Sequence, residues 1–370
     1  MKTVKSNNSL SSLISQIRTL VEGARNKIAR NINSELLITY WNVGRLIVEK
    51  EKTERYDETS VRTMMIELSK ELTREVGKGF SRANLVYMRL LFLEYKSGQT
   101  LSDQKRVIGN SGQTVSNQQK QKDVQTAYKQ IRQTLSDQLS WSHYCELLKI
   151  DDVLERNFYQ QQAIKENWSI RDLKRYKSSA LFYRLALSKD KKGILTLAKK
   201  GHVVEKDSDI IKDPYVLEFL NIPEQHKYSE KQLEQKIIDN LQNFLLELGK
   251  GFAFIGRQYR VTLNNKHYHI DLVFYHRILK CFVLIDLKLN DVAHYDIGQM
   301  NMYLGYFETE MNVANDNPPI GIILSAEKDS VMVEYAMHGI SNKIFVSKYQ
   351  LYLPDKKLLQ KKVQEILDKE

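Results

Sequence analysis

The chain of 370 residues is long enough for two or three domains that each bury a core of their own. Its composition, 42% hydrophobic and 27% charged, is that of an ordinary globular protein, and without a run of about 18 apolar residues it predicts no membrane span. The formal net charge of +11 favours a polyanionic partner such as nucleic acid, although a solvated lysine-rich surface produces the same excess.

The N-terminus and the cysteines indicate a cytoplasmic protein. The first eight residues, MKTVKSNN, lack the apolar core of a secretory signal peptide. Cys145 and Cys281 lie far apart in apolar-periodic segments, so we expect buried free thiols in a reducing compartment rather than a disulfide.

Residues 10–200 are predicted to form an all-helical N-terminal domain. Apolar residues recur there at three- and four-residue spacing, and the first proline of the chain is Pro214. A polar stretch between about residues 97 and 138 repeats a motif that begins at Gln99, Gln113 and Gln133. Its intervals are too irregular for a solenoid, which favours a flexible insertion without a catalytic role.

A second domain is predicted over residues 205–358, and residues 359–370 form the end of a C-terminal helix. Its elements are expected to be a helix at 229–248, strands at 252–263, 268–275 and 280–289, a helix at 296–308, and strands at 320–324 and 344–353. The order of helix, three strands, helix, strand, helix and strand predicts an α+β fold.

The strand that ends at Lys288 carries the first candidate site residues. Side chains alternate between the two faces of a strand, so Asp286 and Lys288 share one face, while the odd positions from Cys281 to Leu287 are apolar. A strand with this pattern is normally central and buried. A buried carboxylate and ammonium at its end are costly unless they are paired or bound to an ion.

Two further acids accompany this strand. Asp271 lies on the preceding strand, joined to the next one by the short loop 276–279, and Glu234 lies on the apolar side of the first helix of this domain. Carboxylates on neighbouring strands can share Mg²⁺, and Lys288 beside them can orient or deprotonate a water and offset charge on a phosphate. A lone Asp-x-Lys is usually a surface ion pair; the order of Glu234, Asp271 and Asp286 favours a metal site.

This arrangement resembles the PD-(D/E)xK nuclease superfamily, whose core runs helix, three strands, helix, strand. The resemblance implies a restriction-endonuclease-like α/β core with a central mixed sheet, in which Asp271, Asp286 and Glu234 hold Mg²⁺ or Mn²⁺ and Lys288 activates water. In that family the middle residue of the last motif, here Leu287, usually lends its carbonyl to the metal. No proline precedes Asp271, which departs from the family pattern.

A signature of the RecB-like branch follows, with Gln299 and Tyr303 spaced as Gln-x-x-x-Tyr on the next helix. More narrowly, the chain resembles the YhcG-like family of bacterial nucleases over nearly its whole length outside the insertion. The resemblance is carried by the blocks YWNVGR at 40–45, GKGFS at 77–81, LSWSHY at 139–144, DPYVLEF at 213–219, GRQ at 256–258 and DNPPIG at 316–321.

Other residues are candidates for contact with nucleic acid. They are Arg257, Gln258 and Arg260 on the first strand, His294 before the Gln299 helix, Arg82 on a helix capped by Ser81, and Arg171, Lys174 and Arg175 on a helix capped by Ser169. Each of these residues also has an alternative role without nucleic acid. The strand residues could be charges on an outer face, His294 could be a solvated loop histidine, and the basic helices could belong to a plain helical bundle. For Asp296 an N-terminal helical position, where its charge meets the helix dipole, is favoured over catalysis.

We expect from these observations a metal-dependent nuclease that hydrolyses DNA positioned by the helical domain. A catalytically silent nucleic-acid-binding protein is the alternative, and a helical adaptor with a docking platform is a third hypothesis. The helical domain could instead be a dimerisation or docking bundle, so a homodimer is also considered.

Overall fold

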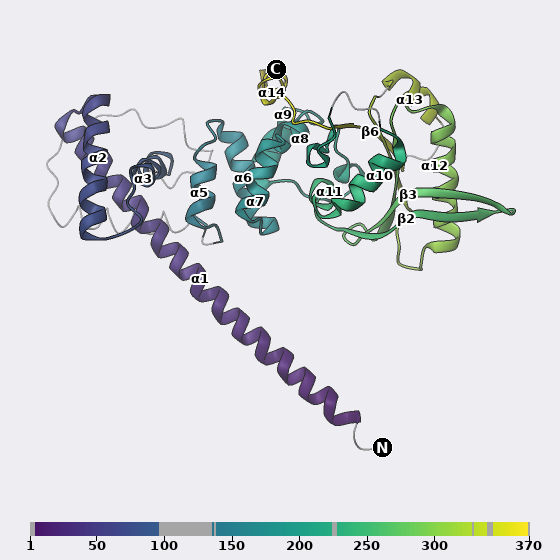
Figure 1. Cartoon of the computed structure of the whole chain (residues 1–370), viewed down its shortest axis with the longest axis horizontal. Coiled ribbons are helices and arrows are strands. Elements are labelled where there is room, and N and C mark those ends of the chain that lie inside the picture. Colours follow the sequence, from purple (N-terminus) through teal and green to yellow (C-terminus); the bar gives the residue numbers. More distant parts are fainter. Residues whose placement is uncertain are drawn as a thin grey trace. The chain divides into compact units, whose positions relative to one another are not determined.

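The computed structural model describes residues 4–95, 135–136, 138–223, 228–327, 329–338 and 343–368. The insertion expected at 97–138 lies outside these residues except at 135, 136 and 138. The chain divides into two compact units, 1–156 and 157–370 (Figure 1).

The first unit is helical, as expected. Its helices are α1 (Val4–Glu54), α2 (Glu58–Glu75), α3 (Arg82–Glu94) and α5 (Trp141–Leu147). Buried Ile47, Met65 and Met88 pack together where α1, α2 and α3 meet. Gly44 permits the close approach of α1 to α3, because a Cβ there would lie 2.0 Å from the carbonyl oxygen of Met88.

The second unit combines helices with one mixed sheet. Its helices are α6 (Val153–Glu166), which crosses the division, α7 (Ile170–Ser178), α8 (Leu181–Ala186), α9 (Lys191–Lys200), α10 (Glu230–Asp239), α11 (Leu241–Leu248), α12 (His294–Tyr306), α13 (Ser330–Met337) and α14 (Lys356–Asp368), with 3-10 turns at Asp207–Ile210 and Glu218–Leu220 and a π turn at Phe307–Met311. Its strands are β1 (Tyr215–Val216), β2 (Phe252–Leu263), β3 (Lys266–His276), β4 (Cys281–Lys288), β5 (Ile320–Ser325) and β6 (Ile344–Gln350). The order in the sheet is β1-β6-β5-β4-β3-β2.

The pairing of the strands confirms the predicted α+β core. β2, β3 and β4 form an antiparallel meander, and β4, β5, β6 and β1 are parallel. One face of the sheet packs against α10 and α11, and the opposite face packs against α12 and α13. Strand β4 is therefore central and covered on both sides, as its apolar pattern predicted.

Two details of this unit differ from the expected elements. The helix expected at 229–248 is broken at Asn240, whose φ of −119° and ψ of 28° are not helical. Strand β1 was not expected, since two residues carry no periodicity; Tyr215 and Val216 pair in parallel with β6.

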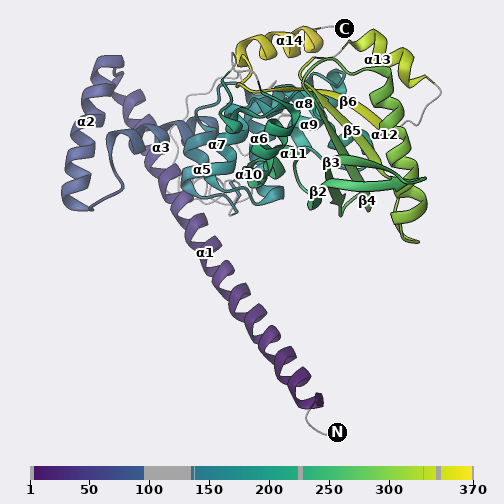
Figure 2. The same cartoon turned by 45° about the vertical axis from the view of Figure 1, so that its right-hand side comes forward.

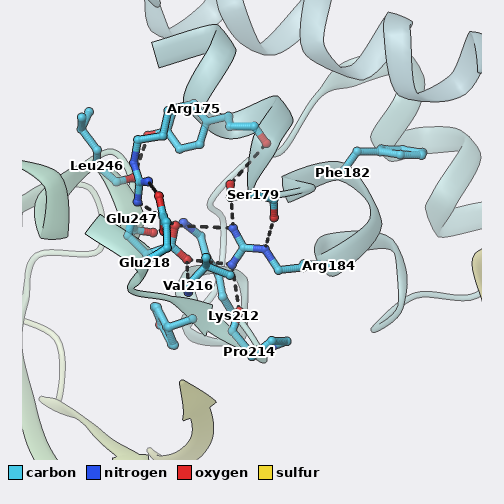
Figure 3. Close-up of polar contacts among 12 residues, drawn as sticks. Arg175, Ser179, Phe182, Arg184, Lys212, Pro214, Val216, Glu218, Leu246 and Glu247 are labelled. Carbon is cyan, nitrogen blue, oxygen red and sulfur yellow. Dashed lines mark hydrogen bonds and ion pairs between the residues drawn. The ribbon is translucent and has the colours of Figure 1, made fainter. Parts of the chain in front are cut away.

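Helices α7 to α9 belong to the unit that contains the sheet, whereas the sequence assigned everything before about residue 200 to the N-terminal domain. Figure 3 shows the contacts responsible: Arg184 of α8 donates to Glu247 of α11 at 2.7 Å and to the carbonyl oxygen of Pro214 at 2.8 Å. The hydroxyl of Tyr176 on α7 donates to the carbonyl oxygen of Leu246 at 2.6 Å. These bonds join elements far apart in sequence and attach α7 and α8 to the unit that contains the sheet.

None of the helices in the described part of the chain has both the length and the apolar composition needed to cross a membrane.

Candidate active site

The structure brings Asp271, in the middle of β3, together with Asp286 and Lys288 at the end of β4. The odd positions of β4 lie in the apolar cluster with α10 and α11, as strand alternation predicted. On the other face, the Nζ of Lys288 lies 2.7 Å from Oδ2 of Asp286 and 3.4 Å from Oδ1 of Asp296 on α12. One ammonium therefore lies between two carboxylates from different elements.

The two aspartates form a buried pair of like charges. Oδ2 of Asp271 accepts the backbone N–H of Leu287 at 2.8 Å. Burial, followed by the neighbouring charge of Asp271, raises the pKa of Asp286 to about 6. Burial likewise raises the pKa of Asp271. The hydrogen bond from the Leu287 N–H favours the charged form and lowers this pKa, but burial outweighs it. Two carboxylates forced together in this way are stabilised by a shared cation.

A hard divalent cation fits this pair. Mg²⁺ is held in proteins by one or two carboxylates and keeps several of its waters, so Asp271 and Asp286 are sufficient protein ligands. Among the described residues, no group of three or more His, Cys, Asp or Glu side chains is placed to hold a metal. Glu234, expected as a third ligand, is thus not gathered with the two aspartates.

Glu234 reaches the site through Gln258. The Nε2 of Gln258 donates to Oε2 of Glu234 at 2.8 Å and to Oδ1 of Asp271 at 3.0 Å. Gln258 lies in β2 with a φ of +45°, a conformation that few residues other than glycine adopt. Sequence reasoning placed Gln258 on the DNA backbone and missed this contact, which depends on the β2–β3 register: Arg257 pairs with Leu272 and Tyr259 with Ile270.

Asp296 has both a structural and an electrostatic role. Its Oδ2 accepts the N–H of Ala293 at 2.8 Å, which secures the start of α12 as the sequence suggested. Its second oxygen faces Lys288. Burial lowers the pKa of Lys288, but Asp286 and then Asp296 outweigh burial, and the net effect raises this pKa.

Gln299 and Tyr303 form a hydrogen-bonded pair beside the site. The Nε2 of Gln299 donates to the Tyr303 hydroxyl at 2.6 Å, and that hydroxyl donates to the carbonyl oxygen of His269 in β3 at 3.1 Å. Tyr303 is fully buried, and burial raises its pKa. The pair fixes α12 against the strand that carries Asp271.

The basic candidates occupy different environments. Arg257 is exposed and donates to Oε1 of Gln235 at 2.8 Å. Exposed side chains are also found at Arg260, His294, Arg82, Arg171 and Lys174. Because these side chains are exposed, their contacts with nucleic acid stay a prediction.

Arg175 lies in a less exposed environment than the other basic candidates. Its guanidinium pairs with Glu218 and lies 3.6 Å from Glu247, and it also stacks over the ring of Phe219 at 5.0 Å. The side chain is only 13% exposed. Arg175 is thus a largely buried cation of α7 with ion-pair partners inside its own unit, and its contact with nucleic acid stays a prediction.

Comparison with known proteins places the chain among nucleases. Residues 208–364 match the model of the YhcG PDDEXK nuclease domain, and residues 16–110 and 100–184 match that of the DUF1016 N-terminal domain. Over 346 residues, 92% of this chain and 90% of the relative, the sequence is 36% identical to the Escherichia coli (strain K12) protein named "Putative nuclease YhcG".

Two solved structures show a distant likeness. A repair endonuclease from Pyrococcus abyssi is 16% identical over 36% of this chain with a TM-score of 0.24, and EndoMS in apo form is 15% identical over 35% with a TM-score of 0.23. The chain spans about half the length of each, 50% and 49%.

Proposed function

The chain belongs to the YhcG family of PD-(D/E)xK nucleases, and on that basis we propose that it is a metal-dependent deoxyribonuclease. The observation that carries the proposal is the buried pair of Asp271 and Asp286 with Lys288 at 2.7 Å from Asp286. A protein that only binds nucleic acid has no use for carboxylates that repel phosphate.

Each residue of the site has a role in phosphodiester hydrolysis. Asp271 and Asp286 would hold Mg²⁺ or Mn²⁺, which supplies Lewis-acid polarisation of the phosphate and activation of water. Lys288, held as an ammonium between Asp286 and Asp296, offsets negative charge that develops on the phosphate oxygens. In the overall reaction the water oxygen bonds to phosphorus, the bond to one sugar oxygen breaks, and a proton from water passes to that oxygen.

The surrounding residues position this centre. Gln258 orients Asp271 and ties it to Glu234, and the Gln299–Tyr303 pair secures α12 against β3. We assign the exposed Arg257, Arg260 and His294 to the DNA backbone near the site. Arg82, Arg171 and Lys174 are proposed as contacts farther along the substrate, supported by their exposure and by the net charge of +11.

The test is cleavage of supercoiled plasmid, linear duplex, single-stranded DNA and RNA by the full chain, with Mg²⁺, with Mn²⁺ and with a chelator. We expect metal-dependent cleavage of at least one DNA substrate and none in the chelator. Cleavage of RNA alone would overturn the DNA assignment. Binding with a steep salt dependence but no cleavage under any metal condition would favour the silent nucleic-acid-binding protein.

A further inference from the structure

The N-terminal half of α1 carries a stripe of exposed apolar side chains. Helix α1 has 51 residues, and Figures 1 and 2 show this half extending away from α2 and α3, helices of the same unit. The exposed fractions reach 73% for Leu20, 60% for Ile28 and 62% for Ile32. Helices in proteins gain most of their stability by packing an apolar face, and a contiguous exposed apolar surface marks an interaction site.

The stripe follows a heptad repeat through residues 13–33, in which five of the six a and d positions are apolar and the last d position is Asn31. Its members are Ile14, Val21 and Ile28 at position a, Ile17 and Ala24 at d, Leu13 and Leu20 at g, and Ile32 at e. Apolar residues at a and d over this length are the pattern of a coiled coil, and the additional leucines at g widen the seam.

This stripe is not the face that packs α1 within its own unit. That face lies in the second half of the helix and contains the buried Leu37, Trp41 and Val48. With 3.6 residues per turn, the two faces point roughly 140° apart around the helix axis. The core of the first unit therefore does not extend along the stripe.

We propose that the stripe is the interface of a homodimer, in which a second copy of this chain supplies the same segment of α1 to a parallel coiled coil. A heptad seam is complementary to itself, because the a and d side chains of one helix fit between those of an identical helix. The β-branched residues at all three a positions, Ile14, Val21 and Ile28, are half of the pattern that favours two parallel strands. The d positions hold Ile17, Ala24 and Asn31 in place of the leucines that complete it, so the number of strands is decided by the mass of the assembly.

The charges beside the seam select the parallel orientation. Arg18 and Arg25 stand at e positions. In an antiparallel pair, e positions face each other, which would bring Arg18 against the partner's Arg25 and repel. In a parallel pair, g faces e, so Leu13 and Leu20 meet the aliphatic stems of the partner's Arg18 and the partner's Arg25 while the guanidinium groups stay in water.

Sedimentation equilibrium of the full chain tests the dimer. We expect a mass twice the 43.3 kDa of one chain for the wild type and the mass of one chain for Val21→Glu and for Ile28→Glu. Leu46→Glu is the matched control, since Leu46 lies on the same helix outside the repeat and is 57% exposed; it should remain dimeric. A monomeric wild type, a larger assembly, or Glu variants that remain dimeric would overturn the proposal.

A cross-linking experiment tests orientation and does not depend on whether the Glu variants fold. In the parallel pair residue 28 lies beside the partner's residue 28, so Ile28→Cys should form a covalent dimer under copper-phenanthroline oxidation. Leu46→Cys should not. An antiparallel pair would place residue 28 near the partner's residue 14, and Ile28→Cys that yields no more covalent dimer than Leu46→Cys would contradict the parallel coil.

Discussion

Gln258 holds a left-handed backbone conformation, with φ +45°, inside strand β2, and such a conformation costs a residue other than glycine about 1–3 kcal/mol. The same residue donates to Glu234 and Asp271 from one amide nitrogen. Strain of this kind persists where the surroundings fix it and is concentrated at functional sites. We therefore regard Gln258 as the residue that positions Asp271 for the metal.

Two substitutions of Gln258 distinguish the contribution of its side-chain amide from the strain of its backbone. Gln258→Ala and Gln258→Gly both lose the amide, so we expect both to weaken Mn²⁺ binding in calorimetric titrations and cleavage by about 10- to 100-fold. Glycine also relieves the left-handed strain, so Gln258→Gly should be more stable than Gln258→Ala by about 1 kcal/mol in urea denaturation. Wild-type Mn²⁺ affinity in both variants would refute the positioning role.

Strand periodicity was enough to predict the centre of the site but not its supports. Asp286 and Lys288 could be placed on one face because side chains alternate along a strand regardless of tertiary context. The contact of Gln258 depends on a register shift between Phe254 and Gly256, which the sequence does not reveal. The ion pairs of Arg175 were not predicted, because its partners lie 43 and 72 residues away, at Glu218 and Glu247.

At the scale of elements, the ion pair of Arg184 and Glu247 joins α8 to α11. Both side chains are fully buried, and the guanidinium also donates to the carbonyl oxygen of Ser179 at 2.9 Å. Glu247 accepts the N–H of Val216 at 2.9 Å, so β1 is held by the same carboxylate. The helices of this region were predictable from their periodicity; their attachment to the sheet was not, because it depends on these long-range pairs.

Removing one partner of this pair should be strongly destabilising. Glu247→Gln leaves the buried charge of Arg184 without its counterion, and we expect a loss of about 3–5 kcal/mol in urea denaturation at neutral pH. Asp239→Asn, which removes an exposed carboxylate on α10, is the control and should cost less than about 1 kcal/mol. Equal effects of the two substitutions would show that the buried pair is not a main support of the fold.

The effect of Glu247→Gln should also depend on pH. Burial raises the pKa of Glu247, but Arg184 and Lys212 outweigh burial and hold this pKa below its ordinary value of 4.5. The stabilisation is therefore complete above about pH 4.5 and is lost as pH falls through the lower pKa of the folded state. The difference in unfolding free energy between wild type and Glu247→Gln should narrow in acid; a difference that widens there would contradict this account.

At the scale of the whole molecule, the structure has two compact units, 1–156 and 157–370, and the domain boundary near residue 200 stays a prediction. The sequence predicted an all-helical part followed by an α+β part, and both are present. It could not assign α7 to α9, since helical periodicity does not indicate which core a helix joins. The contacts of Tyr176 and Arg184 place these helices with the sheet.

Truncation tests this division. A fragment of residues 157–370 keeps the Arg184–Glu247 pair and should unfold in one cooperative thermal transition. A fragment that begins at residue 205 exposes the apolar surface covered by α7 and α8 and leaves Glu247 without Arg184, so we expect it to aggregate or to remain unfolded. Similar melting temperatures for the two fragments would support a domain boundary near residue 200.

The proposed nuclease site of Asp271, Asp286 and Lys288 can be tested by measuring the rate of DNA cleavage by Asp286→Asn at saturating Mg²⁺. Asparagine keeps the shape of the side chain but removes its charge. We expect Asp286→Asn to cleave DNA at least about a hundredfold more slowly than wild type, and we expect Asp239→Asn to cleave at the wild-type rate. Equal rates for wild type and Asp286→Asn would contradict the proposed site.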